Sequence, residues 1–274
     1  MITLPAHITL DEPPWQPHVQ SPVMSMGLKR IAPSDGLQRE HIALSAYAAN
    51  KKRQTQSLGD NVLRVMPNAS EAVEELAQLV EKQLGLPAAA ASDPTDRLYS
   101  CSLHVAEDLC LLQATDEGYS LDAAHLCAPS HWLLEDKIGR TMDPIHAPVP
   151  GYQPALARSV NLFLDKLSGD RLVERFNWSL DEKPALCQRP KTQSSSTARV
   201  LRWYRVERQT LRRLPETGAI VFTILVRQWP LWFLAQQEGG REGLEQALRE
   251  LPPALRAYKS LADGVGLDWA MPSA

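Results

Sequence analysis

The chain has 274 residues, 22% of them charged, and a formal net charge of −3. This length allows one large domain with extensions, and the near-neutral balance offers no basic face for a nucleic-acid backbone. The longest apolar run, residues 219–226, is too short to span a membrane, and the N-terminus lacks a secretory signal. The four cysteines are scattered and include no C-x-x-C pair, which indicates reduced thiols in a cytoplasmic protein.

The N-terminal region, residues 1–97, is predicted to be an extension of the main body. Its first 35 residues are rich in proline, which prevents a sustained helix, so we expect an extended arm wrapped on the main body or a partly disordered segment. A helix follows from Asn68 to Leu84, with Asn68 as the N-cap and Glu71 completing a capping pattern. Gly85 and Pro87 end this helix.

The central region, residues 98–235, has the pattern of an α+β domain. Two strands are followed by an irregular and helical stretch and then by three strands in antiparallel succession. This order predicts a PAS-like five-stranded antiparallel sheet that holds a ligand against the inserted helices. The strands are expected at residues 108–113, 119–126, 171–181, 200–211 and 219–228, the inserted helix at residues 154–167, and a polar loop at residues 188–198.

The C-terminal region, residues 236–274, is predicted to be a helical extension. Two short helices are expected there, separated by Pro252 and Pro253, because neither proline can continue a helix. No internal repeat is visible in the chain.

His146 is the first candidate for a ligand-binding histidine. Prolines on both sides restrict the backbone, so we expect the imidazole in a fixed, non-helical loop just before the inserted helix, at the rim of the cavity. A hydrogen bond from the ring to a loop carbonyl explains the same pattern, and the sequence leaves both interpretations open.

His131 is the second candidate. Ser130 is placed to cap a helix over residues 132–138, which would put His131 at a helix N-terminus, where the dipole favours a neutral imidazole. An ordinary surface residue in a first helical turn is one alternative. Another is an iron site made of His131, His146 and one carboxylate, Glu135 or Asp143.

Polar residues on two neighbouring strands form a second candidate site. Arg205, Glu207 and Gln209 share one face of their predicted strand, and Arg175 and Asn177 can line the same cavity from the preceding strand. A carboxylate inside a cavity is costly unless it is paired, so Glu207 is suited to bind an ammonium group or to move protons. A surface salt-bridge ladder is the alternative.

Several motifs occur in order between about residues 40 and 235. They are CSLHVAEDLCLL from Cys101, CAPSHW from Cys127, KIGR from Lys137, IHAPVPGY from Ile145, FNW from Phe176, RVERQTLRRLP from Arg205 and GAIVFTI from Gly218. Together they resemble the haem-dependent oxidative N-demethylase family. The resemblance implies haem b in a PAS-type cavity and the oxidation of a small secondary amine, such as dimethylamine, with O2.

The resemblance also implies partner subunits. Characterised members take electrons from NADPH and work with separate subunits that supply FMN, a 2Fe-2S cluster and tetrahydrofolate. This sequence has no cysteine grouping for an iron–sulfur cluster and no dinucleotide fingerprint, so we expect the reductase to be another chain.

Under this resemblance, four residues are expected to hold the haem. His146 is the expected proximal iron ligand, with His131 as the second choice. Lys137 and Arg140 are expected to pair with the haem propionates.

Three further residues are expected to bind the substrate. Glu207 would accept the ammonium group on the distal side of the haem, near Arg205 and Asn177. The alternative function is a haem-PAS sensor of gas or redox state, or a non-catalytic binding module. A self-contained sensor would need an output region, and no kinase-like or DNA-binding segment is apparent in the sequence.

Overall fold

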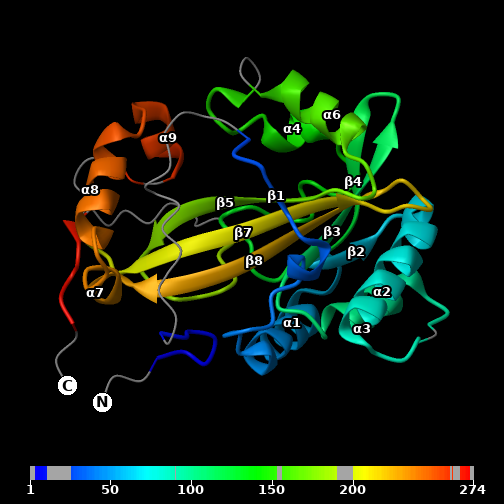
Figure 1. Ribbon diagram of the computed structural model, residues 1–274, viewed down its shortest axis with the longest axis horizontal. Helices are drawn as coiled ribbons and strands as arrows, with labels where there is room; N and C mark the ends of the chain where they lie inside the picture. The colour runs from blue at the N-terminus through cyan, green and yellow to red at the C-terminus, as the bar shows by residue number, and fades with distance from the viewer. Residues whose placement is uncertain are drawn as a thin grey trace.

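A seven-stranded antiparallel sheet forms the centre of the molecule, in the order β1-β5-β7-β8-β3-β4-β2 (Figure 1). The computed structural model describes residues 4–10, 26–89, 91–152, 156–189, 200–259, 261 and 266–271. Its strands are β1 (Lys29–Ile31), β2 (Leu63–Val65), β3 (Asp108–Thr115), β4 (Gly118–His125), β5 (Leu172–Asp181), β7 (Trp203–Arg213) and β8 (Ile220–Pro230). The predicted α+β class is confirmed.

The five predicted strands are the long ones, and two short strands extend the sheet. β1 pairs only with the first three residues of β5, Leu172–Glu174, and β2 pairs with the end of β4. Three-residue strands carry too little alternation to be recognised in a sequence, so the five-strand expectation was wrong in number. A separate parallel pair joins β6 (Val200–Leu201) to β9 (Gly266–Leu267), which splits the strand predicted at residues 200–211.

The helices between the second and third long strands are α4 (Met142–His146) and α6 (Ala157–Lys166), so the predicted insertion is confirmed. Two local expectations in this segment are wrong. Residues 132–138 form turns instead of a helix, with the amides of Lys137 and Ile138 donating to Leu134 O. His146 ends a short helix instead of lying in a non-helical loop. Residues 153–155, where the longer helix was expected to begin, lie outside the described part.

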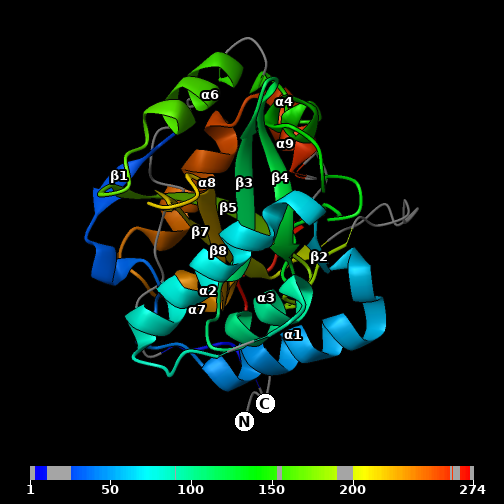
Figure 2. The ribbon, with the colours of Figure 1, turned by 90° about the vertical axis from the view of Figure 1, so that its right-hand side faces the viewer.

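The N-terminal extension contributes three helices beside one end of the sheet (Figure 2). They are α1 (Leu44–Leu58), α2 (Ser70–Leu84) and α3 (Pro94–Ser102), with 3-10 turns at Pro33–Asp35, Gly59–Asn61 and Pro67–Ala69. Gly85 ends α2 at φ +65°, as expected. The predicted cap is wrong, because α2 begins two residues later and Asn68 Nδ2 donates to Asp122 Oδ2 at 2.7 Å.

A single turn, α7 (Leu231–Leu234), follows β8, and the C-terminal extension contains α8 (Gly240–Glu250) and α9 (Pro253–Tyr258). The two predicted helices, separated at Pro252, are therefore confirmed, and α7 is an additional single turn. In Figure 1, α8 and α9 lie near one end of the sheet, and α4 and α6 lie near the other. All four cysteines are free thiols.

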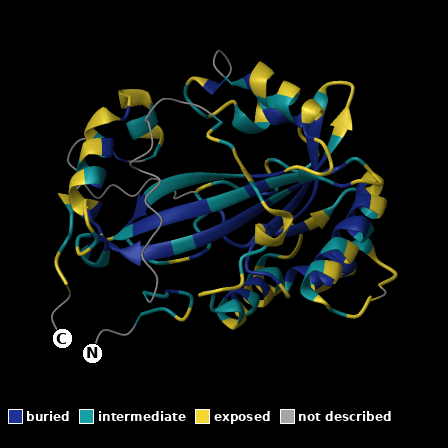
Figure 3. Ribbon diagram, viewed as in Figure 1, coloured by how far each residue is buried: buried dark blue, intermediate teal, exposed yellow. Residues whose placement is uncertain are grey.

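The sheet separates two apolar layers. Strand residues such as Cys110, Leu112 and Ala124 pack with Met142 of α4 and Leu164 of α6 on one face. The other face packs on α2 and α3, and a third cluster surrounds α7 and α8. We call the face that carries Glu207 and Cys110 the site face. Most of the sheet is buried, but residues 174–179 of β5 are only half-buried (Figure 3).

Candidate functional site

A buried carboxylate, Glu207, is the centre of a polar cluster on the site face. Asn177 lies opposite Glu207 in the β5–β7 register, and its Nδ2 donates to Glu207 Oε2 at 3.3 Å. Gln209 Nε2 donates to the same oxygen at 2.9 Å, and the Ser130 hydroxyl donates to Oε1. Because Glu207 is only 7% exposed, these donors replace much of the water that would otherwise solvate the anion.

Arg205 supports this cluster from inside the protein. Its Nε donates to Ser130 Oγ at 2.8 Å, and its Nη atoms donate to the carbonyls of Ala128, Ala185 and Leu186 at 2.8, 3.1 and 3.0 Å. The guanidinium therefore ties the segment after β4 to residues 185–186. It reaches Glu207 only through Ser130, so the structure makes Arg205 a positioning residue.

A lysine from the C-terminal extension completes the cluster. Lys259 directly follows α9, and its Nζ donates to Asn177 Oδ1 at 3.0 Å and to Trp178 O at 2.5 Å. Burial lowers the pKa of Lys259 to about 8, and the Glu207 charge opposes this shift. Sequence reasoning missed Lys259, because its contact with Asn177 spans 82 residues and no local pattern announces it.

Arg175 lies beside Asn177 on the same face of β5, two residues earlier. Its Nε is a buried donor with no hydrogen-bond partner among the described residues. The Glu207 charge acts on this guanidinium, and Arg175 in turn acts on His146. Arg175 therefore lies between the Glu207 cluster and α4.

One ring nitrogen of His146, Nε2, has no hydrogen-bond partner among the described residues. Nδ1 lies 2.9 Å from Met142 O, and a carbonyl can only accept, so Nδ1 carries the hydrogen and Nε2 keeps its lone pair. The ring stacks on Tyr152 with centroids 4.6 Å apart. Burial lowers the pKa of His146, which favours the neutral form that binds metals. The carbonyl bond considered as an alternative is present, but it uses the other nitrogen and resembles the outer-shell bond of many ligating histidines.

His131 lies in a different place. Its backbone adopts φ +61°, and its amide donates to Gln188 O at 2.7 Å. Its Nε2 is 3.9 Å from Asp181 Oδ1 at the end of β5. Asp181 and Arg175 are six residues apart, or about 20 Å along a strand, so the two histidines lie at opposite ends of the site face. The expected position at a helix N-terminus was wrong.

The two cations expected at the haem propionates differ in their surroundings. Lys137 Nζ donates to Ile145 O at 2.5 Å and lies over the Trp132 ring, beside the segment that carries His146. Burial lowers the pKa of Lys137. Arg140 is exposed, and its backbone joins the turn to β4 through Leu121.

The iron site of two histidines and one carboxylate is not formed. Among the described residues, no three His, Cys, Asp or Glu side chains are grouped closely enough to hold a metal ion. Glu135 is paired with Arg189 instead. The separation of His131 from His146 gives the physical reason.

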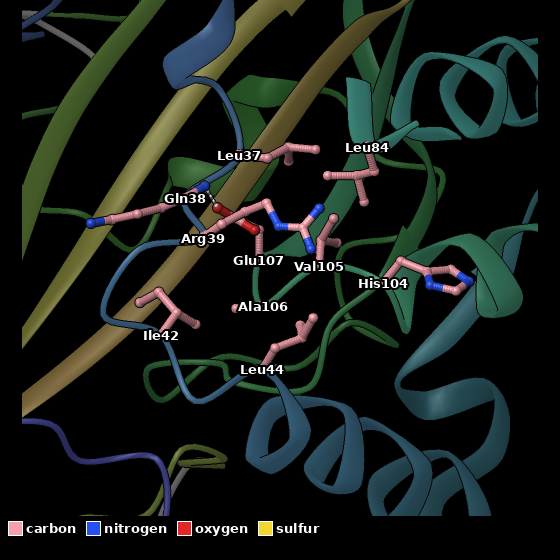
Figure 4. A pocket seen from close by; sticks show the side chains of 10 residues that line it. All are labelled: Leu37, Gln38, Arg39, Ile42, Leu44, Leu84, His104, Val105, Ala106 and Glu107. Atoms are coloured by element: carbon pink, nitrogen blue, oxygen red, sulfur yellow. Dashed lines mark hydrogen bonds between the residues drawn. The ribbon is translucent and has the colours of Figure 1, made fainter. Parts of the chain in front are cut away.

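A cavity of about 220 Å³ lies away from this cluster (Figure 4). The segment from Leu37 to Leu44, the end of α2 and residues 104–107 surround it. Glu107 Oε1 accepts from the Gln38 amide at 2.8 Å, and burial raises the pKa of Glu107. The cavity is smaller than the roughly 300–1,000 Å³ typical of small-molecule sites, and it contains none of the sequence-predicted residues.

The residues around His146 fit a haem. A haem requires an axial ligand, cations for its propionates and apolar walls. His146 Nε2 can supply the first, and Arg175, with its unpaired buried Nε, can supply the second. Tyr152 OH and Asp143 Oδ1 are also buried without partners in the described part. Half-buried apolar side chains of the same layer are Trp132, Ile145, Val160, Phe163, Leu211 and Phe222.

Comparison with known families extends these observations. A family model described as haem-dependent oxidative N-demethylase, alpha subunit-like, matches residues 81–264. This is more than half of the chain, and it includes both histidines, the Glu207 cluster and Lys259. No helix in the described residues is long and apolar enough to cross a membrane. The chain belongs to the haem-dependent oxidative N-demethylase alpha subunit-like family.

Proposed function

We propose that this chain is the haem-binding subunit of an oxidative N-demethylase that acts with O2 on a small secondary amine such as dimethylamine. The observation that carries the proposal is that His146 and Arg175 lie close enough for the charge of one to act on the other. One offers a free, half-buried imidazole nitrogen, and the other offers a buried donor without a partner in the described residues. The family match supports the same reading.

The fold supports a PAS-like core over residues 98–235, with haem b held between the sheet and the inserted helices. The five long strands appear along the chain as β3, β4, then α4 and α6, then β5, β7 and β8. This is the order expected of a PAS domain, which keeps its ligand between sheet and insertion. Order alone is weak evidence, so the side chains of the site carry the argument.

The residues that would hold the haem have separate tasks. His146 would bind the iron through Nε2, with its orientation fixed by Met142 O and by stacking on Tyr152. Lys137 would face the propionates, whereas the exposed Arg140 is less well placed for this, and Arg175 offers a buried donor to a carboxylate on the same side. When bound, the haem supplies the iron centre at which O2 and the amine exchange electrons.

Glu207 would bind the amine. A secondary ammonium group has two N–H donors, and Glu207 offers a carboxylate held in place by Ser130, Asn177 and Gln209. Arg205 fixes Ser130 and therefore the direction of the carboxylate. Because Glu207 is nearly excluded from water, its hydrogen bond with an ammonium group would be strengthened.

The partners follow from the alpha-subunit character of the family. We infer that separate reductase subunits, carrying FMN and a 2Fe-2S cluster and working with tetrahydrofolate, deliver electrons from NADPH. The sequence motifs for these cofactors are not found in this chain.

Haem titration of the purified full chain tests the proposal. We expect one haem per chain, measured as a saturating Soret band that shifts when dimethylamine is added. His146→Ala should abolish stoichiometric binding, and His131→Ala, the matched control at the other end of the face, should retain it. Glu207→Gln should keep the haem and lose the amine-induced shift.

The opposite results would redirect the proposal. Haem lost in His131→Ala and kept in His146→Ala would move the ligand to His131. A Soret band that amines never shift would favour the sensor or binding module. Protein that takes up no haem would refute the proposed function.

A further inference from the structure

The charges around Glu207 are unequal in number. Two cations, Arg175 and Lys259, act on this single carboxylate. Arg205 is separate, because carbonyls and Ser130 occupy its donors. Two other acidic side chains of this side act on the histidines instead: Asp143 acts on His146, and Asp181 lies beside His131. One positive charge is therefore left without a counterpart in this part of the structure.

Arg175 shows where a ligand's negative charge would lie. A buried guanidinium donor without an acceptor is costly, and Arg175 Nε has none among the described residues. The planar fork of arginine matches the two oxygens of a carboxylate. The preceding residue of the strand, Glu174, is on the opposite face and is already paired with Arg208 at 2.9 Å. The missing acceptor must therefore come from outside the described residues.

Lys259 is fixed beside the same space. Asn177 Oδ1 and Trp178 O account for two of the three donors of its ammonium group. Asn177 also donates to Glu207, and it lies about 7 Å from Arg175 along the strand. The two cations and the carboxylate thus surround one short stretch of β5, residues 175–177.

We propose that Arg175 and Lys259 bind a carboxylate next to the ammonium position at Glu207, so that the substrate is an N-methyl amino acid. This inference rests on the proposed function and names its substrate class. The zwitterion satisfies both halves of the cluster: its ammonium group donates to Glu207, and its carboxylate accepts from Arg175 and Lys259. Dimethylamine would satisfy only the first half and add a third positive charge.

The reaction is balanced for this class. The N-methyl amino acid reacts with O2, two electrons and two protons to give the primary amino acid, formaldehyde and water. The N–CH3 bond breaks, the methyl carbon is oxidised, and O2 is reduced. The two electrons come from the reductase subunit that the proposed function already requires.

The same two cations would also suit a haem propionate, which carries the same carboxylate chemistry. The two sources differ in what the variants change. If the carboxylate belongs to the substrate, removing a cation weakens the binding of the N-methyl amino acid and leaves haem affinity unchanged. If it belongs to the haem, removing a cation weakens haem binding and leaves the preference between amines unchanged.

The test uses the full chain loaded with haem and titrated with N-methylglycine and with dimethylamine, followed by haem absorbance and by calorimetry. We expect N-methylglycine to bind at least about tenfold more tightly. Arg175→Gln and Lys259→Gln should each lower the affinity for N-methylglycine by about tenfold. Both variants should bind dimethylamine as tightly as the unaltered chain or more tightly, because each has lost a cation that repels the ammonium group. Arg171→Gln, at an exposed position one residue before β5, is the control.

Each other outcome overturns the substrate assignment. Equal binding of the two amines by the unaltered chain, or equal losses of both in the variants, would show that no substrate carboxylate is held here. Weaker haem binding with unchanged amine preference would assign the cations to the propionates. A normal response to dimethylamine in that case would leave the proposed function standing, whereas a chain without haem would refute both.

Discussion

The site face of the sheet is apolar over β3 and β4 and polar over β5 and β7. Cys110 and Ala124 pack under α4 and α6, whereas Arg175, Asn177 and Glu207 occupy the corresponding alternate positions further along the same face. Both halves are built from antiparallel strand pairs, although the β3–β4 pair has a register shift between Leu111 and Leu112 and the β5–β7 pair has none. One half supplies burial energy and the other gathers charged groups, so their variants should fail in different assays.

Arg205→Ala should give the largest effect and break this division. Arg205 belongs to the polar half, yet it is 1% exposed and donates to four backbone carbonyls and to Ser130. Its removal leaves buried acceptors without donors, so we expect unfolding free energy to fall by about 3–5 kcal/mol in urea titrations. That loss would match or exceed the roughly 2–5 kcal/mol expected for Leu112→Ala in the apolar half.

Gln209→Ala is the matched control for Arg205→Ala. It lies four residues further along the same face, is half-buried and makes one hydrogen bond to Glu207. We expect its stability loss to stay near 1 kcal/mol. Similar losses of unfolding free energy in both variants would show that Arg205 has no special structural task.

Acid should destabilise the fold through His125, which lies on the opposite face from the site. Its Nδ1 is 2.6 Å from Ser102 Oγ, and its Nε2 is 2.9 Å from Thr55 Oγ1. Burial, helped by the Lys51 charge, lowers the pKa of His125 to about 3. The unfolded chain, with a histidine pKa near 6.5, takes up the proton first, so stability is complete above pH 6.5 and is lost as the pH falls.

Between pH 7 and pH 5, protonation of this single group in the unfolded chain should lower the free energy of unfolding by about 2 kcal/mol. Urea titration at each pH measures this loss. His125→Gln cannot be protonated, so it should show a correspondingly smaller slope in this range. An unchanged slope in the variant would mean that groups other than His125 dominate acid sensitivity.

Arg175→Gln should give the smallest effect and the opposite sign. The haem-free chain contains its buried Nε without a partner in the described residues, so replacing the charge should stabilise this form by about 1 kcal/mol in thermal or urea unfolding. Arg171→Gln should change stability by less than about 0.5 kcal/mol. A destabilised Arg175→Gln would show that the guanidinium supports the fold itself.

Much of the fold was predictable, because strong local signals produced it. The alternation in β5 and the apolar stripe of α2 gave their type and face correctly. Short elements were missed where no period develops, as in β1 and β2. The helix α3 had a usable signal, since Asp93 accepts from the amides of Thr95 and Asp96 ahead of Pro94.

The site was predictable only in parts. The shared face of Arg205, Glu207 and Asn177 follows from strand alternation and pairing, which the sequence indicates. The separation of His131 from His146 does not, because fifteen residues of turns set it. Neither do the bonds of Ser130 and Lys259, which join segments 77 and 82 residues apart in the chain.

The outer side of β5 beyond Glu174 has no neighbouring strand in the described part of the chain. Such an edge offers a row of backbone groups to which a strand from another molecule can attach, and this is a route to aggregation. Lys259 covers one carbonyl in that row, at Trp178. The lysine that contacts Asn177 therefore also blocks part of this edge, and replacing Lys259 would leave the Trp178 carbonyl open to a strand from another molecule.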